Sequence, residues 1–407
     1  MFLDSNFLYK NIHKKDRNNR EINLYKITDV SLIGQNLYYP NCLLKKESNV
    51  INPMDEKIMS LKDVTTQENY SINDTVKTTV LNTPVFYFVY NTDNYYHFIY
   101  DTLPYLMSYK FIKKEIPSIK LLMNYPAENN NKFYPFVLEF LNLLDIDVVG
   151  DVVICDSNTV YKEIYISNSY THGIDSNLPP RYEVYQLYKH IVGKVTKSVV
   201  DYNNQPKKIY VSRRSWMHND FTNIGTNYTT RRKLINEDEL VESLVKQGFV
   251  EVFTENLTTV EKILLFSQVE YVVGSIGGGM CNVLFSKPQT KVLSIISPTF
   301  LDVNNRFKYS FSNVNVSYFT ETSHVSNDLF KKYMRVKCND VIGEIIDVSE
   351  DELTISYSKN FVAGWNNQTK YENKILNKKY CKPLDNGLNS EWTLNVKDLI
   401  TTIYNGE

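Results

Sequence analysis

The sequence predicts an α/β fold with two Rossmann-like domains, and three observations support it. Apolar, β-branched and aromatic runs alternate with helical patterns from Pro84 to about residue 166. The alternation starts again after the polar, proline-containing segment 201–207. A glycine-rich loop at 274–279 follows a strand pattern and precedes a short helical one. Strands that alternate with helices favour parallel sheets covered on both faces.

Size and charge restrict the class of protein. The chain has 407 residues, of which 43% are hydrophobic, which is enough for two or three domains with cores of their own. Its 45 basic and 46 acidic residues give a net charge of -1, which argues against nucleic acid as a partner. No apolar run approaches the roughly 18 residues that a membrane span needs, and the first residues lack a signal-peptide pattern. We expect no transmembrane segment.

The cysteines predict a reducing environment. They are odd in number and form no C-x-x-C pair: Cys42, Cys155, Cys281, Cys338 and Cys381. This pattern argues against a disulfide framework and against a structural zinc site. We therefore expect a cytoplasmic location, meaning host cytoplasm or virion for a viral protein.

The first half of the chain forms the predicted N-terminal domain, residues 1–200, in which residues 1–80 are an irregular extension of short strands and loops. A buried strand is expected at 85–90, followed by a helix capped by Asn94 and kinked or restarted at Pro104. The later elements alternate in type: a strand at 119–123, a helix at 133–144, and strands at 152–154 and 164–166.

The second half predicts a Rossmann-like domain at 207–330. Helices are expected at 236–247, after the N-cap residue Asn236, and from the capping-box pair Thr258 and Glu261. A short helix is expected around 282–285, and the strands are predicted at 209–212, 249–253, 271–273 and 291–296. Residues 331–407 read as an extension: Gly343 interrupts a weak strand pattern at 341–348, and a closing helix is expected at 394–404.

The glycine-rich loop is the first candidate for chemistry. Gly277, Gly278 and Gly279 would let the backbone approach a ligand, and the helix start near Asn282 would favour a pyrophosphate. The loop matches neither a Walker A motif nor the dinucleotide fingerprint. A tight turn that allows close packing of helix on sheet is the alternative.

Two arginine pairs are the second candidate. Arg213 and Arg214 follow a strand end, and Arg231 and Arg232 precede a helix. Carboxyl ends of strands face the ligand crevice in doubly wound sheets, and arginine binds phosphate with two parallel hydrogen bonds. The alternative is a solvated surface arginine, which we favour for at least two of the four.

His97 and Asp101 are the third candidate. Their i,i+4 spacing places both on one helix face. An imidazole with a pKa near ~6.5 can accept a proton from a sugar hydroxyl, and a neighbouring carboxylate can orient it. The alternative is a helix-surface ion pair without catalytic meaning.

Asp145 and Asp147 form a D-x-D sequence, the pattern that binds a metal and a diphosphate in some glycosyltransferases. Here it follows a predicted helix rather than a strand, so we interpret it as a chance match. The histidines show no metal-ligand spacing.

In this order, the candidates resemble glycosyltransferase family 61, which includes plant xylosyl- and arabinosyltransferases and animal N-acetylglucosaminyltransferases. Residues 97–104 are similar to its H-F-x-x-D-x-L-P segment. Residues 210–213 and 232–237 are similar to its Y-x-S-R and R-R-x-x-N-E segments, with Lys233 replacing the second arginine. Residues 273–285 are similar to V-G-x-H-G-A-G-x-x-N-x-x-F, but Ile276 stands at the histidine and Gly278 at the alanine. The likeness covers about residues 85–300.

The resemblance implies a GT-B architecture, with two Rossmann-like domains whose parallel sheets face each other across a cleft. It implies an inverting hexosyl- or pentosyltransferase that needs no metal and no cofactor beyond its nucleotide-sugar co-substrate, UDP-linked in our expectation. The acceptor would be a hydroxyl of a glycan or a glycoprotein. His97 would be the base and Asp101 its orienting partner, although the opposite assignment stays open.

The resemblance also assigns a donor site, with Glu237 expected on ribose hydroxyls. Its residues would be Arg213, Arg232, Asn236, Glu237, Gly277, Gly278, Gly279 and Asn282. Two alternatives remain: a metal-dependent transferase that uses Asp145 and Asp147, and a non-catalytic sugar- or nucleotide-binding protein, which Ile276 makes conceivable. The oligomeric state is not indicated.

Overall fold

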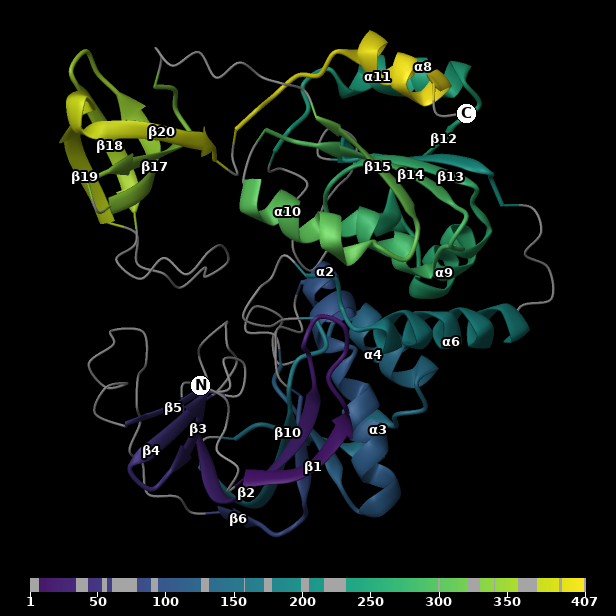
Figure 1. Ribbon diagram of the computed structural model, residues 1–407, viewed down its shortest axis with the longest axis vertical. Helices are drawn as coiled ribbons and strands as arrows, with labels where there is room; N and C mark the ends of the chain where they lie inside the picture. Colours follow the sequence, from purple (N-terminus) through teal and green to yellow (C-terminus); the bar gives the residue numbers. More distant parts are fainter. Residues whose placement is uncertain are drawn as a thin grey trace. The chain divides into compact units, whose positions relative to one another are not determined.

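The computed structural model describes the chain from residue 7 to 405 with gaps, and it divides into two compact units (Figure 1). The described ranges are 7–33, 43–52, 57–60, 79–88, 94–125, 132–156, 158–171, 178–198, 205–215, 232–298, 301–320, 330–339, 341–357, 372–387 and 390–405. One unit covers residues 1–194, and the second begins at Val195. No helix among the described residues is both long and apolar enough to span a membrane.

The sheet of the first unit is mixed, which differs from the parallel sheet expected there. Its order is β5-β4-β3-β2-β10-β7-β8-β9, with β1 beside β2 and β6 beside β10. The first five strands pair antiparallel: β1 (Leu8–His13), β2 (Ile22–Ile33), β3 (Leu43–Lys46), β4 (Asn49–Asn52) and β5 (Lys57–Ser60). The others run parallel to one another: β6 (Thr79–Leu81), β7 (Val85–Tyr87), β8 (Lys120–Met123), β9 (Val152–Ile154) and β10 (Thr159–Ser167). The short strands expected in residues 1–80 therefore pair, among the described residues, into an antiparallel half of this sheet, which differs from the irregular extension that we had expected.

The helices of the first unit follow the expected order around β7 and β8. Asn94 caps the first turn, because its Oδ1 accepts a hydrogen bond from the His97 backbone N–H at 3.2 Å. Pro104 restarts the helix as predicted, since α3 begins directly after it. The elements are α2 (Tyr95–His97), the π-helix η2 (Phe98–Thr102), α3 (Tyr105–Glu115), α4 (Pro135–Leu143), α5 (Val148–Asp151) and α6 (Tyr182–Ser198). Of these, α5 and α6 were absent from the prediction.

The second unit contains a wholly parallel sheet of order β12-β11-β13-β14-β15. Its strands are β11 (Lys208–Val211), β12 (Val250–Val252), β13 (Tyr271–Ser275), β14 (Lys291–Ile296) and β15 (Asn315–Thr320). The helices between them are α8 (Glu237–Lys246), η4 (Thr254–Asn256), α9 (Thr259–Gln268), η5 (Gly278–Phe285) and α10 (Leu301–Ser310). If the five strands are numbered 1 to 5 along the chain, their order across the sheet is 2-1-3-4-5, which is a doubly wound topology. The run of βαβ units predicted here is therefore confirmed.

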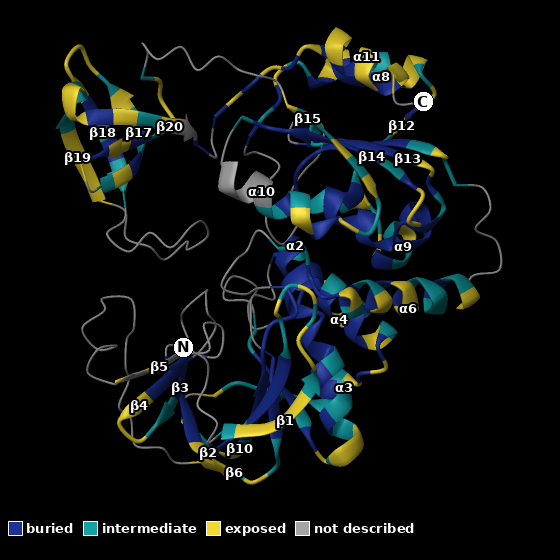
Figure 2. Ribbon diagram, viewed as in Figure 1, coloured by how far each residue is buried: buried dark blue, intermediate teal, exposed yellow. Residues whose placement is uncertain are grey.

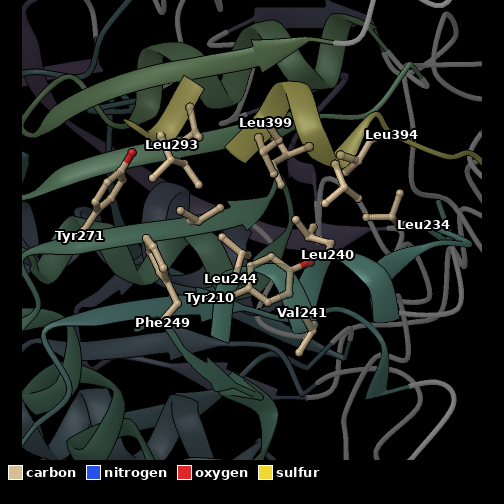
Figure 3. Packing of buried hydrophobic residues seen from close by; sticks show 14 of the residues in the cluster. Tyr210, Leu234, Leu240, Val241, Leu244, Phe249, Tyr271, Leu293, Leu394 and Leu399 are labelled. Carbon is tan, nitrogen blue, oxygen red and sulfur yellow. The ribbon is translucent and has the colours of Figure 1, made fainter. Parts of the chain in front are cut away.

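The core of this sheet is closed by the end of the chain. The predicted closing helix forms as α11 (Val396–Asn405). Figure 3 shows Leu399 of α11 and Leu240 of α8 packed over the strands that carry Tyr210 and Leu293. The strands β13 and β14 are almost entirely buried (Figure 2).

Residues 334–386 form a third, antiparallel sheet of order β19-β18-β17-β16-β20, where we had expected little regular structure. The strands are β16 (Met334–Cys338), β17 (Val341–Val348), β18 (Glu352–Tyr357), β19 (Glu372–Asn377) and β20 (Cys381–Asn386), with η6 (Lys378–Tyr380) before the last. Gly343 does not break β17. A Cβ there would lie 2.8 Å from the Ser356 carbonyl oxygen, so glycine permits the close approach of β18.

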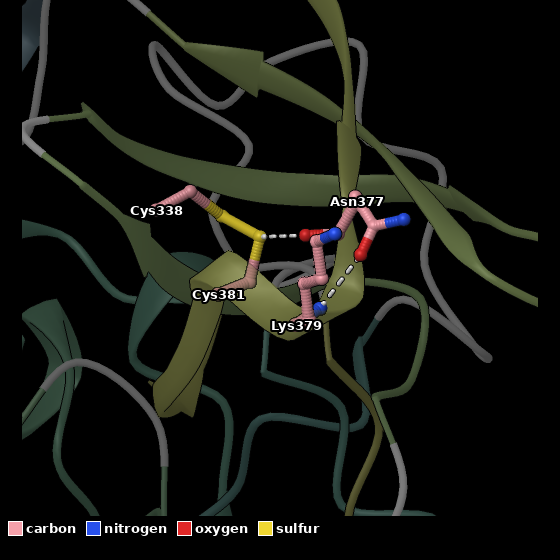
Figure 4. The surroundings of a disulfide bond; sticks show 4 residues. All are labelled: Cys338, Asn377, Lys379 and Cys381. Atoms are coloured by element: carbon pink, nitrogen blue, oxygen red, sulfur yellow. Dashed lines mark hydrogen bonds between the residues drawn. A yellow bond between two sulfur atoms is a disulfide. The ribbon is translucent and has the colours of Figure 1, made fainter.

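The expectation that the cysteines form no disulfide was wrong for one pair. Cys338 and Cys381 form a disulfide between β16 and β20, at positions directly opposite each other in the strand pairing (Figure 4). The two lie 43 residues apart in sequence, so only the strand register brings them together. The cysteine pattern therefore no longer supports a reducing compartment. Cys155 and Cys281 are free thiols.

Candidate functional site

The first candidate site lies at the switch point of the sheet in the first unit, where the neighbours of β7 are reached in opposite directions along the sheet. From β7 the chain moves through α3 to β8 on one side, and β10 later pairs with β7 on its other side. The crevice at the carboxyl ends of two such strands is where doubly wound sheets bind ligands. His97 and Asp101 follow β7, and Thr171 follows β10, so both segments lie beyond the carboxyl ends of two adjacent parallel strands.

The His97–Asp101 pair is buried and directly hydrogen-bonded. The His97 Nδ1 lies 2.7 Å from Asp101 Oδ2, and the Asp101 side chain is 0% exposed. The Thr171 hydroxyl donates to the other carboxylate oxygen, Oδ1, at 2.9 Å. Because a carboxylate only accepts, Nδ1 carries the proton and Nε2 is the basic nitrogen. This burial is incompatible with the alternative of a solvent-exposed surface pair.

Aromatic rings fix the helix that carries the pair. The Tyr96 ring contacts the imidazole of His97 edge-on, with 5.1 Å between centroids, and stacks on Tyr100 at 5.5 Å. The Tyr188 hydroxyl of α6 donates to the Ile99 carbonyl at 2.9 Å. The imidazole is therefore held by packing as well as by its carboxylate.

The second candidate site lies at the corresponding place in the second unit. The chain leaves β11 towards β12 on one side, and β13 pairs with β11 on the other. Arg213 follows β11 and the glycine loop follows β13, so the topology brings them together. A Cβ on Gly277 would overlap Nη1 of the Arg213 guanidinium, whereas one on Gly278 would meet nothing within 4 Å. A Cβ on Gly279 would lie 2.6 Å from Thr254 Oγ1.

The two adjacent arginines have different roles. Arg214 forms a fork-shaped ion pair with Glu251, at 2.7 and 2.6 Å, and also binds Asp238 at 2.5 Å. Hydrogen bonding to Glu251 raises the pKa of Arg214. Arg213 instead lies against Gly277, and burial lowers the pKa of its guanidinium although Glu237 and Glu255 stand nearby. Arg214 is thus a structural arginine held in ion pairs, which differs from the solvated surface arginine of the alternative, and Arg213 is the candidate for phosphate.

Glu237 supports the end of β11 from within the protein. Its Oε1 accepts from the Tyr210 hydroxyl at 2.8 Å, the Ser212 hydroxyl at 3.1 Å and the Arg213 backbone N–H at 2.7 Å. The residue is only 1% exposed, and burial raises the pKa of its carboxyl group. This placement differs from the expected contact with ribose hydroxyls, because the carboxylate is enclosed by its own strand.

Two other predicted donor residues, Asn236 and Asn282, hold the backbone through their side chains, and a third, Arg232, is held by its own backbone. The Asn236 amide bonds both ways to Leu394, donating to its carbonyl at 2.9 Å and accepting from its N–H at 3.1 Å. Asn282 is fully buried and donates to the Gly279 carbonyl at 2.9 Å. Arg232 has a left-handed backbone, φ 55°, and its carbonyl accepts from the Trp392 indole at 3.0 Å. Arg231 and the loop at 216–230 lie outside the described residues.

The D-x-D pair has local structural partners. Asp145 forms an ion pair with Lys194, and Asp147 caps α5 by accepting from the Val149 N–H at 3.1 Å. Both precede α5 rather than end a strand, as interpreted from the sequence. Ile276 is 3% exposed and its N–H bonds to the Ile295 carbonyl, so it packs into the sheet.

Sequence reasoning missed Thr171. The signal available was a polar run, Asn168 to Thr171 with Tyr170 inside it, directly after the predicted strand at 164–166. Polar residues at a parallel strand's carboxyl end belong to the crevice edge.

Comparison with known families matches residues 95–293 to the family described as Glycosyltransferase 61. The matched range contains the His97–Asp101 pair, Arg213 and the glycine loop. No curated protein matches the chain.

Proposed function

Residues 95–293 are a glycosyltransferase family 61 domain, and from this premise we propose that the chain is an inverting, metal-independent glycosyltransferase with a UDP-sugar donor. The proposal includes the GT-B architecture, a donor site in the second unit and an acceptor site in the first. The observation that carries it is the contact between Arg213 and Gly277 at the switch point of the parallel sheet.

The donor site would stabilise the leaving diphosphate. Arg213 offers a planar donor fork, and Gly277 lets that guanidinium lie against the loop backbone because glycine has no Cβ to displace it. As the bond between the anomeric carbon and the diphosphate oxygen breaks, negative charge develops on the nucleotide. A preorganised guanidinium stabilises this charge without reorganising. Glu237 supports this geometry by holding the Arg213 backbone.

The acceptor site would supply the base. The Nε2 of His97 accepts the proton of the acceptor hydroxyl while that oxygen attacks the anomeric carbon from the face opposite the diphosphate, which inverts the configuration. Asp101 holds the Nδ1–H and stabilises the imidazolium that forms, so this geometry favours His97 as base and Asp101 as its orienting group. A glycan or glycoprotein hydroxyl is the acceptor, and the transferred unit is a hexose or a pentose.

A thermal-shift screen tests the donor half of this proposal. We expect UDP-N-acetylglucosamine, UDP-xylose or UDP-arabinose to stabilise the protein, by about 2.7 kcal/mol at 100 times the dissociation constant. The chelator EDTA should leave UDP release unchanged. His97→Ala and Asp101→Ala should lower UDP release by orders of magnitude and keep the thermal shift. Normal UDP release by both variants would refute the assignment of the base.

A further inference from the structure

The Asp101 carboxylate is held from two sides, by residues far apart in the chain. Its Oδ2 faces His97 and its Oδ1 accepts the Thr171 hydroxyl at 2.9 Å. Thr171 is 3% exposed, and its backbone N–H bonds to the Ser169 hydroxyl at 3.2 Å. With both oxygens engaged, the plane of the carboxylate is fixed, and the imidazole ring is fixed with it.

The segment that carries Thr171 is in turn held by the N-terminal hairpin. The Arg20 guanidinium, at the turn between β1 and β2, donates to the carbonyls of Tyr170 at 3.5 Å, Thr171 at 3.4 Å and Leu178 at 3.2 Å. Arg20 therefore contacts the backbone at Tyr170 and Thr171, and again at Leu178. Three carbonyls around one planar donor group fix the backbone at these residues.

A second arginine, Arg181, lies on the segment that follows Thr171 and donates hydrogen bonds back to the hairpin. Arg181 is 5% exposed, and its Nη1 donates to the carbonyls of Lys14, at 3.0 Å, and Arg20. Its charge is balanced by a fork-shaped pair with Glu183, at 3.1 and 2.9 Å. Burying a guanidinium is costly unless it is fully paired, and these contacts fix the hairpin to the segment around Thr171.

The turn is itself built to present Arg20. Asp16 Oδ1 accepts from the backbone N–H groups of Asn18, at 2.9 Å, and Arg20, at 3.0 Å, and Asn19 adopts a left-handed φ of 60°. All of these residues lie before residue 95, outside the range that matches the family model.

We propose that Thr171 and Arg20 are positioning residues for the His97–Asp101 pair, so that the N-terminal hairpin is a working part of the acceptor site. This inference rests on the proposed function for its meaning in catalysis. The hairpin holds Thr171, Thr171 holds Asp101, and Asp101 keeps the proton of His97 on Nδ1.

Nitrogen NMR of the full-length protein, labelled with ¹⁵N-histidine, tests the inference without any substrate. The resonance of His97, assigned with His97→Gln, should report the Nδ1–H tautomer in the wild type. Thr171→Val should give a mixture of tautomers, and Thr171→Ser should restore the wild-type signal. Arg20→Ala should resemble Thr171→Val. The matched control is Arg17→Ala, since Arg17 is exposed on the same turn. An unchanged His97 resonance in folded Thr171→Val overturns the proposal.

Kinetics provide an independent readout. Thr171→Val should lower the rate of UDP release about tenfold, as expected for one hydrogen bond to a charged group, with the UDP-induced thermal shift intact. In an Asp101→Ala background, Thr171→Val should have no further effect, because its partner is gone. If Thr171→Val lowers the rate of UDP release equally in both backgrounds, Thr171 does not act through Asp101. Full activity of His97→Ala instead refutes the proposed base and leaves the tautomer result standing.

Discussion

The guanidinium of Arg213 lies so close to the α-carbon of Gly277 that a methyl group on Gly277 would overlap it. Gly277 has an extended backbone, φ 175°, which any residue can adopt, so the need for glycine is steric. The neighbouring Gly278 has open space around its α-carbon.

This difference predicts opposite results for two adjacent substitutions. Gly277→Ala should displace Arg213 and weaken UDP binding by about 10- to 100-fold, because a small misplacement of a binding group has a large effect. Gly278→Ala should bind UDP like the wild type. Isothermal titration calorimetry measures both. If the two variants bind UDP with equal affinity, the glycine loop is not part of the donor site.

Substitution of Arg213 and of Arg214 should affect different properties, the first ligand binding and the second stability. Arg214→Ala should reduce the free energy of unfolding by roughly 1–3 kcal/mol, because it leaves the half-buried Glu251 without its partner. UDP affinity should stay near the wild-type value. Arg213→Ala should do the reverse: it should weaken UDP binding by about 10- to 100-fold with a smaller change in stability. Urea titration and calorimetry on both variants provide the comparison.

Glu237 should make the stability depend on pH. Burial raises the pKa of its carboxyl group above the ordinary value of 4.5, so the folded state binds a proton more tightly than the unfolded state. The stabilising effect of that proton is fully present below pH 4.5 and is lost as pH rises through the folded-state pKa. Glu237→Gln cannot ionise, so its melting temperature should rise relative to the wild type as pH increases from 4.5 towards 8. A constant difference across this range would contradict the assignment.

The Cys338–Cys381 disulfide should stabilise only the small sheet. Closing a loop of 43 residues stabilises by about 4 kcal/mol in the chain-entropy relation. Cys338→Ala with Cys381→Ala should lower hydrogen-exchange protection in β16–β20 and leave the UDP-induced thermal shift intact. Cys155→Ala is the control, since Cys155 is a free thiol. If a reductant changes UDP affinity, the sheet takes part in donor binding.

Local patterns predicted the elements that position the candidate sites. The Asn94 cap, the Pro104 restart and the βαβ run from β11 to β14 each depend on short-range signals, and all formed. What failed depends on contacts distant in sequence. The register of β16 and β20 sets the disulfide, and the fold buries Glu237 against β11, although an acidic residue in a first helical turn normally faces solvent. Thr171 lies 70 residues from Asp101, beyond any motif that a single sequence could reveal.

The sheet formed by β16–β20 begins and ends at one point of the chain. The Gly387 N–H donates to the Tyr333 carbonyl at 2.5 Å, and Met334 pairs with Asn386. The strands of the parallel sheet, β11–β15, precede this point, and the residues that close its core, Leu394 and Leu399, follow it. The described residues of 334–386 therefore form a sheet whose two ends adjoin. If this sheet were removed, the polypeptide would still reach α11 and cover the parallel sheet.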